Sequence, residues 1–161
     1  MRTILIPTDF TVDSLIPLKK ILQINGDDPI RVVLFHCISL SDSITDLLFF
    51  SKAAEIRRLG NPAFTDACEI IRNRFIPQPN ALLVDLFTGN NAAAFENFVE
   101  GHRADTLCLI ENFVYRRPSR QSVDPREFIR KSPVPVLKVN VELPTSPLTQ
   151  NCLAALFSET I

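Results

Sequence analysis

Residues 107–139 read LCLIENFVYRRPSRQSVDPREFIRKSPVPVLKV, and this stretch decides the fold. It begins as an apolar strand, continues as an arginine-rich loop, restarts as a short helix and ends as a second strand. In many α/β proteins a junction of this kind holds phosphate, and its loop is then built from glycine. The sequence contains no glycine after Gly101. The stretch therefore predicts an α/β fold and raises the question of whether a nucleotide site persists in it.

Strand-like and helix-like segments alternate outward from this stretch along the chain. Apolar strands are expected at residues 3–9, 30–38, 81–87, 106–110 and 134–141. Strands that are apolar on both faces, each followed by a segment of helix length, predict a parallel sheet covered on both sides. With right-handed crossovers, the expected fold class is an open five-stranded parallel sheet in a doubly wound, three-layer α/β/α sandwich of the Rossmann-like type.

The helices are expected between these strands. Ser14 is a candidate cap for a helix over residues 15–24, and a shorter helix is expected at 91–101. The segment 41–75 is interpreted as two helices, or as one helix broken near Gly60, with Asn61-Pro62 as the N-cap and first residue of the restart.

Composition and charge exclude several classes of protein. The chain has 161 residues, a hydrophobic content of 46% and a formal net charge of −1, which favour one globular domain without a nucleic-acid partner. Its apolar runs are too short to cross a bilayer, and the N-terminus lacks the pattern of a signal peptide. We therefore expect a cytoplasmic protein with no membrane partner.

The cysteines and histidines do not predict a metal site. The four cysteines, at positions 37, 68, 108 and 152, form no CxxC, and their spacing to His36 and His102 is irregular. Reduced core thiols are the expectation, and His36 lies within a strand where a packed core histidine is expected. No nucleophile elbow, P-loop or zinc-protease motif is present, so the sequence predicts no enzyme.

Four segments together resemble the universal stress protein family. They are ILIPTDFTVDSL at the first strand, VVLFHCI at the second, HRADTLCLI at the fourth, and FIRKSPVPVLKV at the last helix and strand. The resemblance covers roughly residues 2–141, which we take as one domain (1–141) followed by a C-terminal extension (142–161). It implies the adenine nucleotide alpha hydrolase-like variant of the predicted sandwich, in a family that includes members that bind ATP and members that do not.

The resemblance implies that ATP binding has been lost and that no cofactor is needed. Binders carry the signature G-x2-G-x9-G-[S/T] between the fourth strand and the last helix. Its glycines fall here near Leu109 or Ile110, near Asn112, and on Ser122. Asn112 is the one replacement suited to a left-handed backbone. Asp124-Pro125 also predicts a helix start whose free N–H groups receive the protein's own carboxylate instead of phosphate.

A degenerate nucleotide-binding site is nevertheless expected at the carboxyl ends of the strands. By resemblance, Asp9 and the position of Ile38 flank the adenosine pocket, although Asp9 is equally expected to cap the following turn with Thr8 or Thr11. The arginines of the loop either clamp an anion or are solvated charges that pair with Glu111 or Asp124. The candidate binding residues are Pro7, Thr8, Asp9, Ile38, Arg116, Arg117 and Arg120.

The function that these observations favour is non-catalytic. We expect a stress-response protein that acts through homodimerisation and through contact with a further protein partner. The resemblance implies dimerisation through the last strand, residues 134–141, with Val134 and Val141 at its ends. The alternatives are a sensor of adenine nucleotide or another small ligand and, with less support, a nucleotide hydrolase. In the extension, four apolar residues predict that it folds back on the body or onto a partner: Leu148, Cys152, Leu156 and Phe157.

Overall fold

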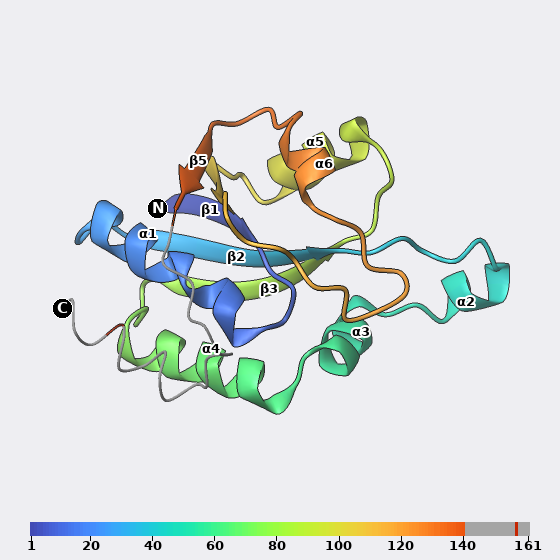
Figure 1. Ribbon diagram of the computed structural model, residues 1–161, viewed down its shortest axis with the longest axis horizontal. Coiled ribbons are helices and arrows are strands. Elements are labelled where there is room, and N and C mark those ends of the chain that lie inside the picture. The colour runs from blue at the N-terminus through green and yellow to red at the C-terminus, as the bar shows by residue number, and fades with distance from the viewer. Residues whose placement is uncertain (141–156, 158–161) are drawn as a thin grey trace.

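The computed structural model of the chain describes residues 1–140 and 157. Its five strands are all paired in parallel, in the spatial order β3-β2-β1-β4-β5, and form one open sheet (Figure 1). The strands are β1 (Arg2–Pro7), β2 (Ile30–Cys37), β3 (Ala81–Phe87), β4 (Thr106–Ile110) and β5 (Val136–Val139). The fold class predicted from the sequence is confirmed.

Helices cover both faces of the sheet and complete the three layers. One core cluster joins the sheet to α1 and α4, and the other joins it to α5 and α6. The helical elements are η1 (Val12–Leu15), α1 (Pro17–Asn25), α2 (Ile44–Leu48), α3 (Lys52–Leu59), α4 (Pro62–Arg74), α5 (Ala92–Gly101) and α6 (Arg126–Ile129).

The inner strand β2, which lies between β3 and β1, shows why the sheet is parallel and buried. Val32 and Leu34 belong to one core cluster, whereas Val33 and Phe35 belong to the other. All four side chains are fully buried, so neither face of this strand meets water. A strand of this kind requires helices on both sides, which parallel crossovers supply.

The first helix begins later than predicted. Ser14 does not cap it: α1 starts at Pro17, and its N-cap residue Ile16 makes no side-chain cap bond. The buried Ser14 hydroxyl instead donates to the carbonyl of Thr11 at 2.7 Å and pairs with the Thr8 hydroxyl at 2.7 Å. The serine is thereby used to fix the turn after β1.

The segment between β2 and β3 forms three helices, one more than the larger of the two alternatives that the sequence offered. The extra element, α2, is a single short helix on a connection that projects beyond the body (Figure 1). The predicted break between the other two is confirmed, because Gly60 ends α3 and the Asn61 side chain accepts from the Phe64 N–H at 2.9 Å. Pro62 then opens α4.

The two outer strands of the sheet differ in how their free edges are satisfied. On β3, the Arg72 guanidinium donates twice to the Leu82 carbonyl, and the Asp85 carboxylate accepts from the Leu86 N–H. On β5, Pro135 and Val139 make backbone hydrogen bonds toward β4. The backbone N–H and C=O groups of Val136 and Lys138 therefore point away from β4, to the free edge of the sheet. Within the described residues, no hydrogen bond reaches these two outward N–H groups.

The last strand is shorter than the predicted span of 134–141. Ser132 forms a tight turn with Val134, because its hydroxyl donates to the Val134 carbonyl and accepts from the Val134 N–H. This turn precedes Pro135 and delays the start of β5 to Val136. Val141 lies outside the described residues.

Phe157 returns to the body of the protein. It is 1% exposed, and its ring lies 5.3 Å from that of Phe75, beside the core between α1 and α4. The fold-back expected of the extension is therefore seen at this residue, whereas Leu148, Cys152 and Leu156 lie outside the described part. Across that part, none of the helices has both the length and the apolar character that a membrane crossing requires.

Candidate functional site

The structure brings the predicted site residues together at the carboxyl ends of β1 and β2. Pro7 ends β1, Thr8 and Asp9 follow it, and Ile38 follows β2; all four are buried. The loop that follows β4 returns over this end of the sheet, with its three arginines exposed. The nearest contact between the two groups is made by backbone, since the Arg116 N–H donates to Asp9 Oδ2 at 2.9 Å.

The Asp9 carboxylate is fully occupied within the protein. Its Oδ1 accepts from both the N–H and the hydroxyl of Thr11, which confirms the predicted turn cap. Its Oδ2 accepts from the Arg116 N–H. The carboxylate that the resemblance places beside adenosine therefore ties the loop to the end of β1.

The end of β2 is covered by the same loop. Ile38 and Ser122 form an antiparallel bridge, and hydrogen bonds from Ser39 N–H to the Gln121 carbonyl and from Val123 N–H to the Cys37 carbonyl flank it. These bonds are 2.7 and 2.9 Å long. The chain thus lays its own backbone on the position that the resemblance assigns to adenine.

His36 of β2 holds the loop after β4 to the turn after β1. Its Nδ1 lies 2.7 Å from the Thr8 carbonyl, and its Nε2 lies 2.8 Å from the Ser122 hydroxyl. Since a carbonyl only accepts, Nδ1 carries the proton and Nε2 accepts from Ser122. Burial lowers the pKa of His36 because it disfavours the charged ring, and the nearby Thr8 carbonyl and Asp9 only partly oppose this. The predicted core histidine is therefore also the anchor of the loop.

Sequence reasoning missed the role of Ser122. The sequence marked Ser122 only as the place of an absent glycine, yet the buried hydroxyl bonds both His36 and the Ser119 N–H. A serine 86 positions from its histidine leaves no local pattern, so no signal in the sequence identifies this pair.

The backbone of the loop does not form a phosphate cradle. Leu109 and Ile110 lie within β4, and neither Asn112 nor Ser122 has a positive φ. The non-glycine residues with positive φ in the described part are Phe10 and Arg103. The backbone shape that the glycine signature permits is therefore not adopted at any of the three matched positions.

Asp124 supplies its own carboxylate to the start of α6, as predicted, but it is not the N-cap: the helix begins at Arg126, and Pro125 is its N-cap residue. Its Oδ1 accepts from the Arg126 N–H at 3.0 Å, and its Oδ2 pairs with the Arg126 guanidinium at 2.9 Å. Burial alone would raise the pKa of this carboxyl, but the bonds from Arg126 outweigh it and hold the pKa below its usual range. An incoming phosphate meets a negative charge here.

The predicted ion pairs of the loop arginines are not formed. Asp124 pairs with Arg126, and neither Glu111 nor Asp124 forms a salt bridge with Arg116, Arg117 or Arg120. No described residue forms a salt bridge with these three guanidinium groups, which point to solvent as exposed positive charges.

The described residues contain no set of side chains arranged to bind a metal ion. No three His, Cys, Asp or Glu side chains among them are grouped to hold an ion. Cys37, Cys68 and Cys108 are buried and unpaired, and burial raises the thiol pKa of Cys68 and Cys108 to about 12. These three are the inert core thiols that the sequence predicts, while Cys152 lies outside the described part.

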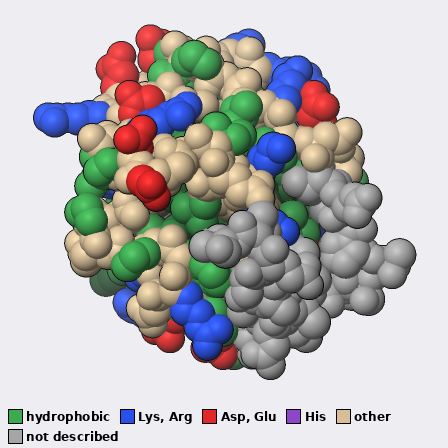
Figure 2. Space-filling model, turned by 90° about the vertical axis from the view of Figure 1, so that its left-hand side faces the viewer, with side chains coloured by type: hydrophobic (Ala, Val, Ile, Leu, Met, Phe, Trp, Pro, Cys, Tyr) green, Lys and Arg blue, Asp and Glu red, His purple; other side chains and the backbone are tan. Residues whose placement is uncertain are grey.

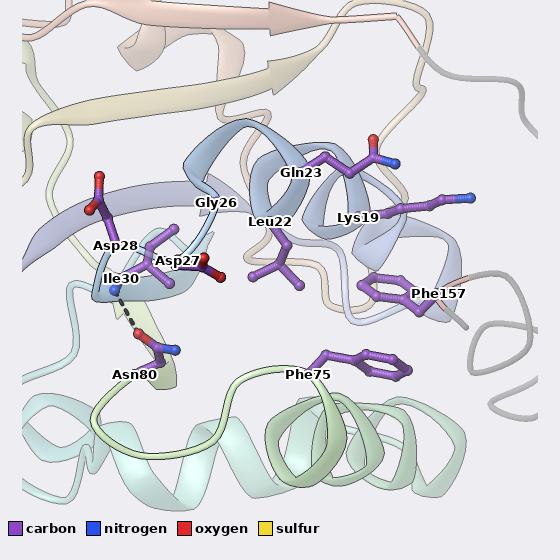
Figure 3. A pocket seen from close by; sticks show the side chains of 10 residues that line it. All are labelled: Lys19, Leu22, Gln23, Gly26, Asp27, Asp28, Ile30, Phe75, Asn80 and Phe157. Atoms are coloured by element: carbon purple, nitrogen blue, oxygen red, sulfur yellow. Dashed lines mark hydrogen bonds between the residues drawn. The ribbon is translucent and has the colours of Figure 1, made fainter. Parts of the chain in front are cut away.

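A separate cavity of about 590 Å³ lies at the opposite, amino end of the sheet. Figure 3 shows Leu22, Ile30, Phe75 and Phe157 on its apolar side, while polar and charged side chains line the rest, among them Asp27. The surface at this end mixes acidic, basic and apolar side chains (Figure 2). Open α/β sheets bind their ligands at the carboxyl ends, so this cavity is not the counterpart of a nucleotide site.

The fold and the site define an open, parallel α/β sandwich whose carboxyl edge is covered by the loop after β4. No family model and no curated protein matches the sequence. Solved structures with this fold include universal stress proteins. One, in complex with cAMP, is 18% identical at a TM-score of 0.50, over 88% of this chain and 98% of that one.

Two further structures agree with this one over most of their length. The universal stress protein UspA from Lactobacillus plantarum is 12% identical at a TM-score of 0.52, over 86% of this chain and 97% of the other. A hypothetical protein whose biochemical function was assigned from its structure is 20% identical at a TM-score of 0.54, over 89% and 98%. These likenesses show that the chain has the universal stress protein fold.

Proposed function

We propose that this chain is a non-catalytic, cytoplasmic stress-response protein of the universal stress type that does not bind ATP. It acts by pairing with itself through β5 and by contacting a further protein. The observation that carries the loss of the nucleotide site is the closed loop, whose Arg116 N–H holds Asp9 and whose Ser122 covers Ile38.

Opening the cleft for a nucleotide breaks several interactions at once. The bonds from Arg116 to Asp9 and from Ser122 to His36 are lost, together with the bridge at Ile38. At about 1 kcal/mol for each lost bond, two of them lower affinity roughly 30-fold and three lower it roughly 140-fold, since each 1.4 kcal/mol is tenfold. The Asp124 carboxylate then adds repulsion toward phosphate.

The pairing surface is proposed from the position of β5. This strand lies at one edge of the sheet, and the outward backbone N–H and C=O groups of Val136 and Lys138 are available to a second strand. A two-fold axis beside β5 pairs the strand with its own copy in antiparallel orientation, which satisfies the same groups on both chains.

Titration calorimetry with ATP, ADP, AMP and cAMP tests the loss of the nucleotide site. We expect millimolar or weaker affinity for each nucleotide. When no nucleotide is added during purification, the ratio of absorbance at 260 and 280 nm should be that of polypeptide alone. A Kd of about 10 μM or tighter, which corresponds to roughly −7 kcal/mol, would overturn the proposal.

A sensor of small anions is the second candidate. It is favoured by the three exposed arginines and by the cAMP complex formed by a protein of the same fold. In this case the loop opens, and replacing Arg116, Arg117 and Arg120 by serine weakens nucleotide binding in the calorimeter. A hydrolase, the third candidate, is tested by incubating the protein with ATP and Mg²⁺ and measuring released phosphate.

A further inference from the structure

The connection between β2 and α3 presents apolar side chains to solvent. In this segment, residues 39–51, which we call the arm, Ile44 is 74% exposed, Leu48 76% and Phe49 82%. Helix α2 within it has no buried residue. Because burying one such side chain contributes about 1.5–3 kcal/mol, a cluster of them on a projecting helix marks a surface that binds a partner.

Hydrogen bonds within the arm fix its conformation in the isolated chain. Ser43 caps α2 by accepting from the Asp46 N–H, and Ser41 donates to the Asp46 carboxylate at 3.0 Å. A groove of about 330 Å³ runs beside it, with the side chains of Leu47 and Phe49 among those that line it. The exposed helix is therefore a preformed structure and not a collapsed loop.

The arm and the loop after β4 carry opposite charges. The charged residues of the arm are Asp42 and Asp46, both exposed. The loop over residues 112–121, which we call the arginine loop, carries Arg116, Arg117, Arg120 and no acid, and its Val114 is 78% exposed. Each surface thus combines exposed apolar side chains with a charge that complements the other.

The two surfaces lie beside each other at the same end of the molecule. Gln121 of the arginine loop lines the groove together with arm residues, and its carbonyl accepts from the Ser39 N–H at 2.7 Å. A two-fold axis that passes between adjacent, complementary surfaces places each opposite its complement on the other copy. The acidic arm of one chain then meets the arginine loop of the second, and the reverse contact forms at the same time.

We propose that a second copy of this chain binds here, with each arm packed on the arginine loop of the other. The occupant is a second copy because the complementary charge and the complementary apolar side chain are both supplied by the chain itself. This contact is separate from β5 and goes beyond the pairing proposed above. It also gives the three arginines a partner that the isolated chain lacks.

Charge exchange between two variants tests the contact, in a background with Lys138→Pro to suppress pairing through β5. One variant carries Asp42→Lys and Asp46→Lys, and the other carries Arg116→Glu and Arg117→Glu. We expect the background protein to dimerise in sedimentation equilibrium, each variant alone to associate at least tenfold more weakly, and an equal mixture to recover the dimer. Raising NaCl from 50 to 500 mM should weaken the dimer severalfold.

The apolar half of the contact has its own variant and control. Phe49→Ser should abolish association, whereas Ile24→Ser, at a residue 53% exposed on α1, should leave it unchanged. Circular dichroism confirms that each variant is folded, and a misfolded one is replaced by Leu48→Ser. A background protein that stays monomeric at 200 μM, or a mixture that does not recover association, would overturn the inference. Failure of β5 pairing appears separately, as an unchanged assembly on adding Lys138→Pro to the wild-type chain.

Discussion

His36 is one of the residues that hold the loop after β4 closed, and it is the one that can be protonated near neutral pH. It links the turn after β1 to the loop after β4 through one ring, with the neutral tautomer fixed by the Thr8 carbonyl. Phe10 packs edge-on against the ring at 5.1 Å, so the site is apolar as well as hydrogen-bonded. A proton on Nε2 would end the acceptance from Ser122.

This arrangement predicts a loss of stability on mild acidification. The folded-state pKa of His36 lies below the value of about 6.5 for an unfolded histidine, so the unfolded chain binds more protons as pH falls below 6.5. Stability is therefore complete above pH 6.5 and declines below it, by at most about 1.4 kcal/mol for each pH unit. Urea unfolding at pH 7.5, 6.5, 5.5 and 5.0 measures the decline.

The two histidines of the chain provide a matched pair of variants for this measurement. His36→Asn should be less stable at pH 7.5 by about 1–3 kcal/mol, because it leaves buried partners unsatisfied, and should lose the His36 part of the pH dependence. His102→Asn should retain that part. Carboxylates with lowered pKa, such as Asp124, contribute a loss only at lower pH. An unaltered slope in His36→Asn would contradict the assignment.

At the scale of elements, the sequence predicted the sheet because its signals are local. Each central strand is an apolar run, and helix ends such as Gly60-Asn61-Pro62 are marked by the residues themselves. The turn at Ser14 was assigned wrongly because a buried hydroxyl partner, Thr8, competed with the cap.

The loop after β4 could be predicted only in part, since what closes it is distant in sequence. The bond from Arg116 to Asp9 joins residues 107 positions apart, and the pair of His36 and Ser122 spans 86. Periodicity and capping rules act over a few residues and cannot reveal such bonds. Topology placed the candidate residues at one edge of the sheet, because the carboxyl ends of parallel strands meet there, while their role in binding a ligand stays a prediction.

The free edge of β5 predicts the effect of a proline. Lys138→Pro removes an outward N–H while leaving the ladder to β4, which uses the residues on either side. Self-association through β5 should weaken at least tenfold in analytical ultracentrifugation. Lys138→Thr retains the N–H and should associate as the wild type does; equal weakening in both would point to the side chain instead.

Phe157 of the C-terminal extension is predicted to stabilise the folded domain. Phe157→Ala should lower the free energy of unfolding by about 3 kcal/mol, since it removes a buried ring packed on Phe75. Ile24→Ala, at a half-exposed position, should change it by about 0.5 kcal/mol or less. Urea unfolding compares them, and equal values would show that Phe157 does not stabilise the domain in solution.

For the whole molecule, the two proposed contacts lie on different faces and are each two-fold. β5 lies at one edge of the sheet, and the arm projects from the carboxyl ends of the strands (Figure 1). Two separate two-fold contacts on one chain build either a closed dihedral assembly, such as a tetramer, or an open chain. Loss of one contact should leave a dimer of the other kind, which sedimentation distinguishes from the monomer.

The partly capped edge of β3 makes it a poorer site for strand addition than the edge of β5. Strand addition is a chain-growth reaction, and it continues only while the newest outer edge offers free donors and acceptors. Arg72 and Asp85 occupy the Leu82 carbonyl and the Leu86 N–H, so a pair joined at β5 presents two outer edges on which these groups are already bonded. The same side chains that stabilise β3 thus compete with any incoming strand for its backbone groups, which disfavours growth of the sheet from that edge.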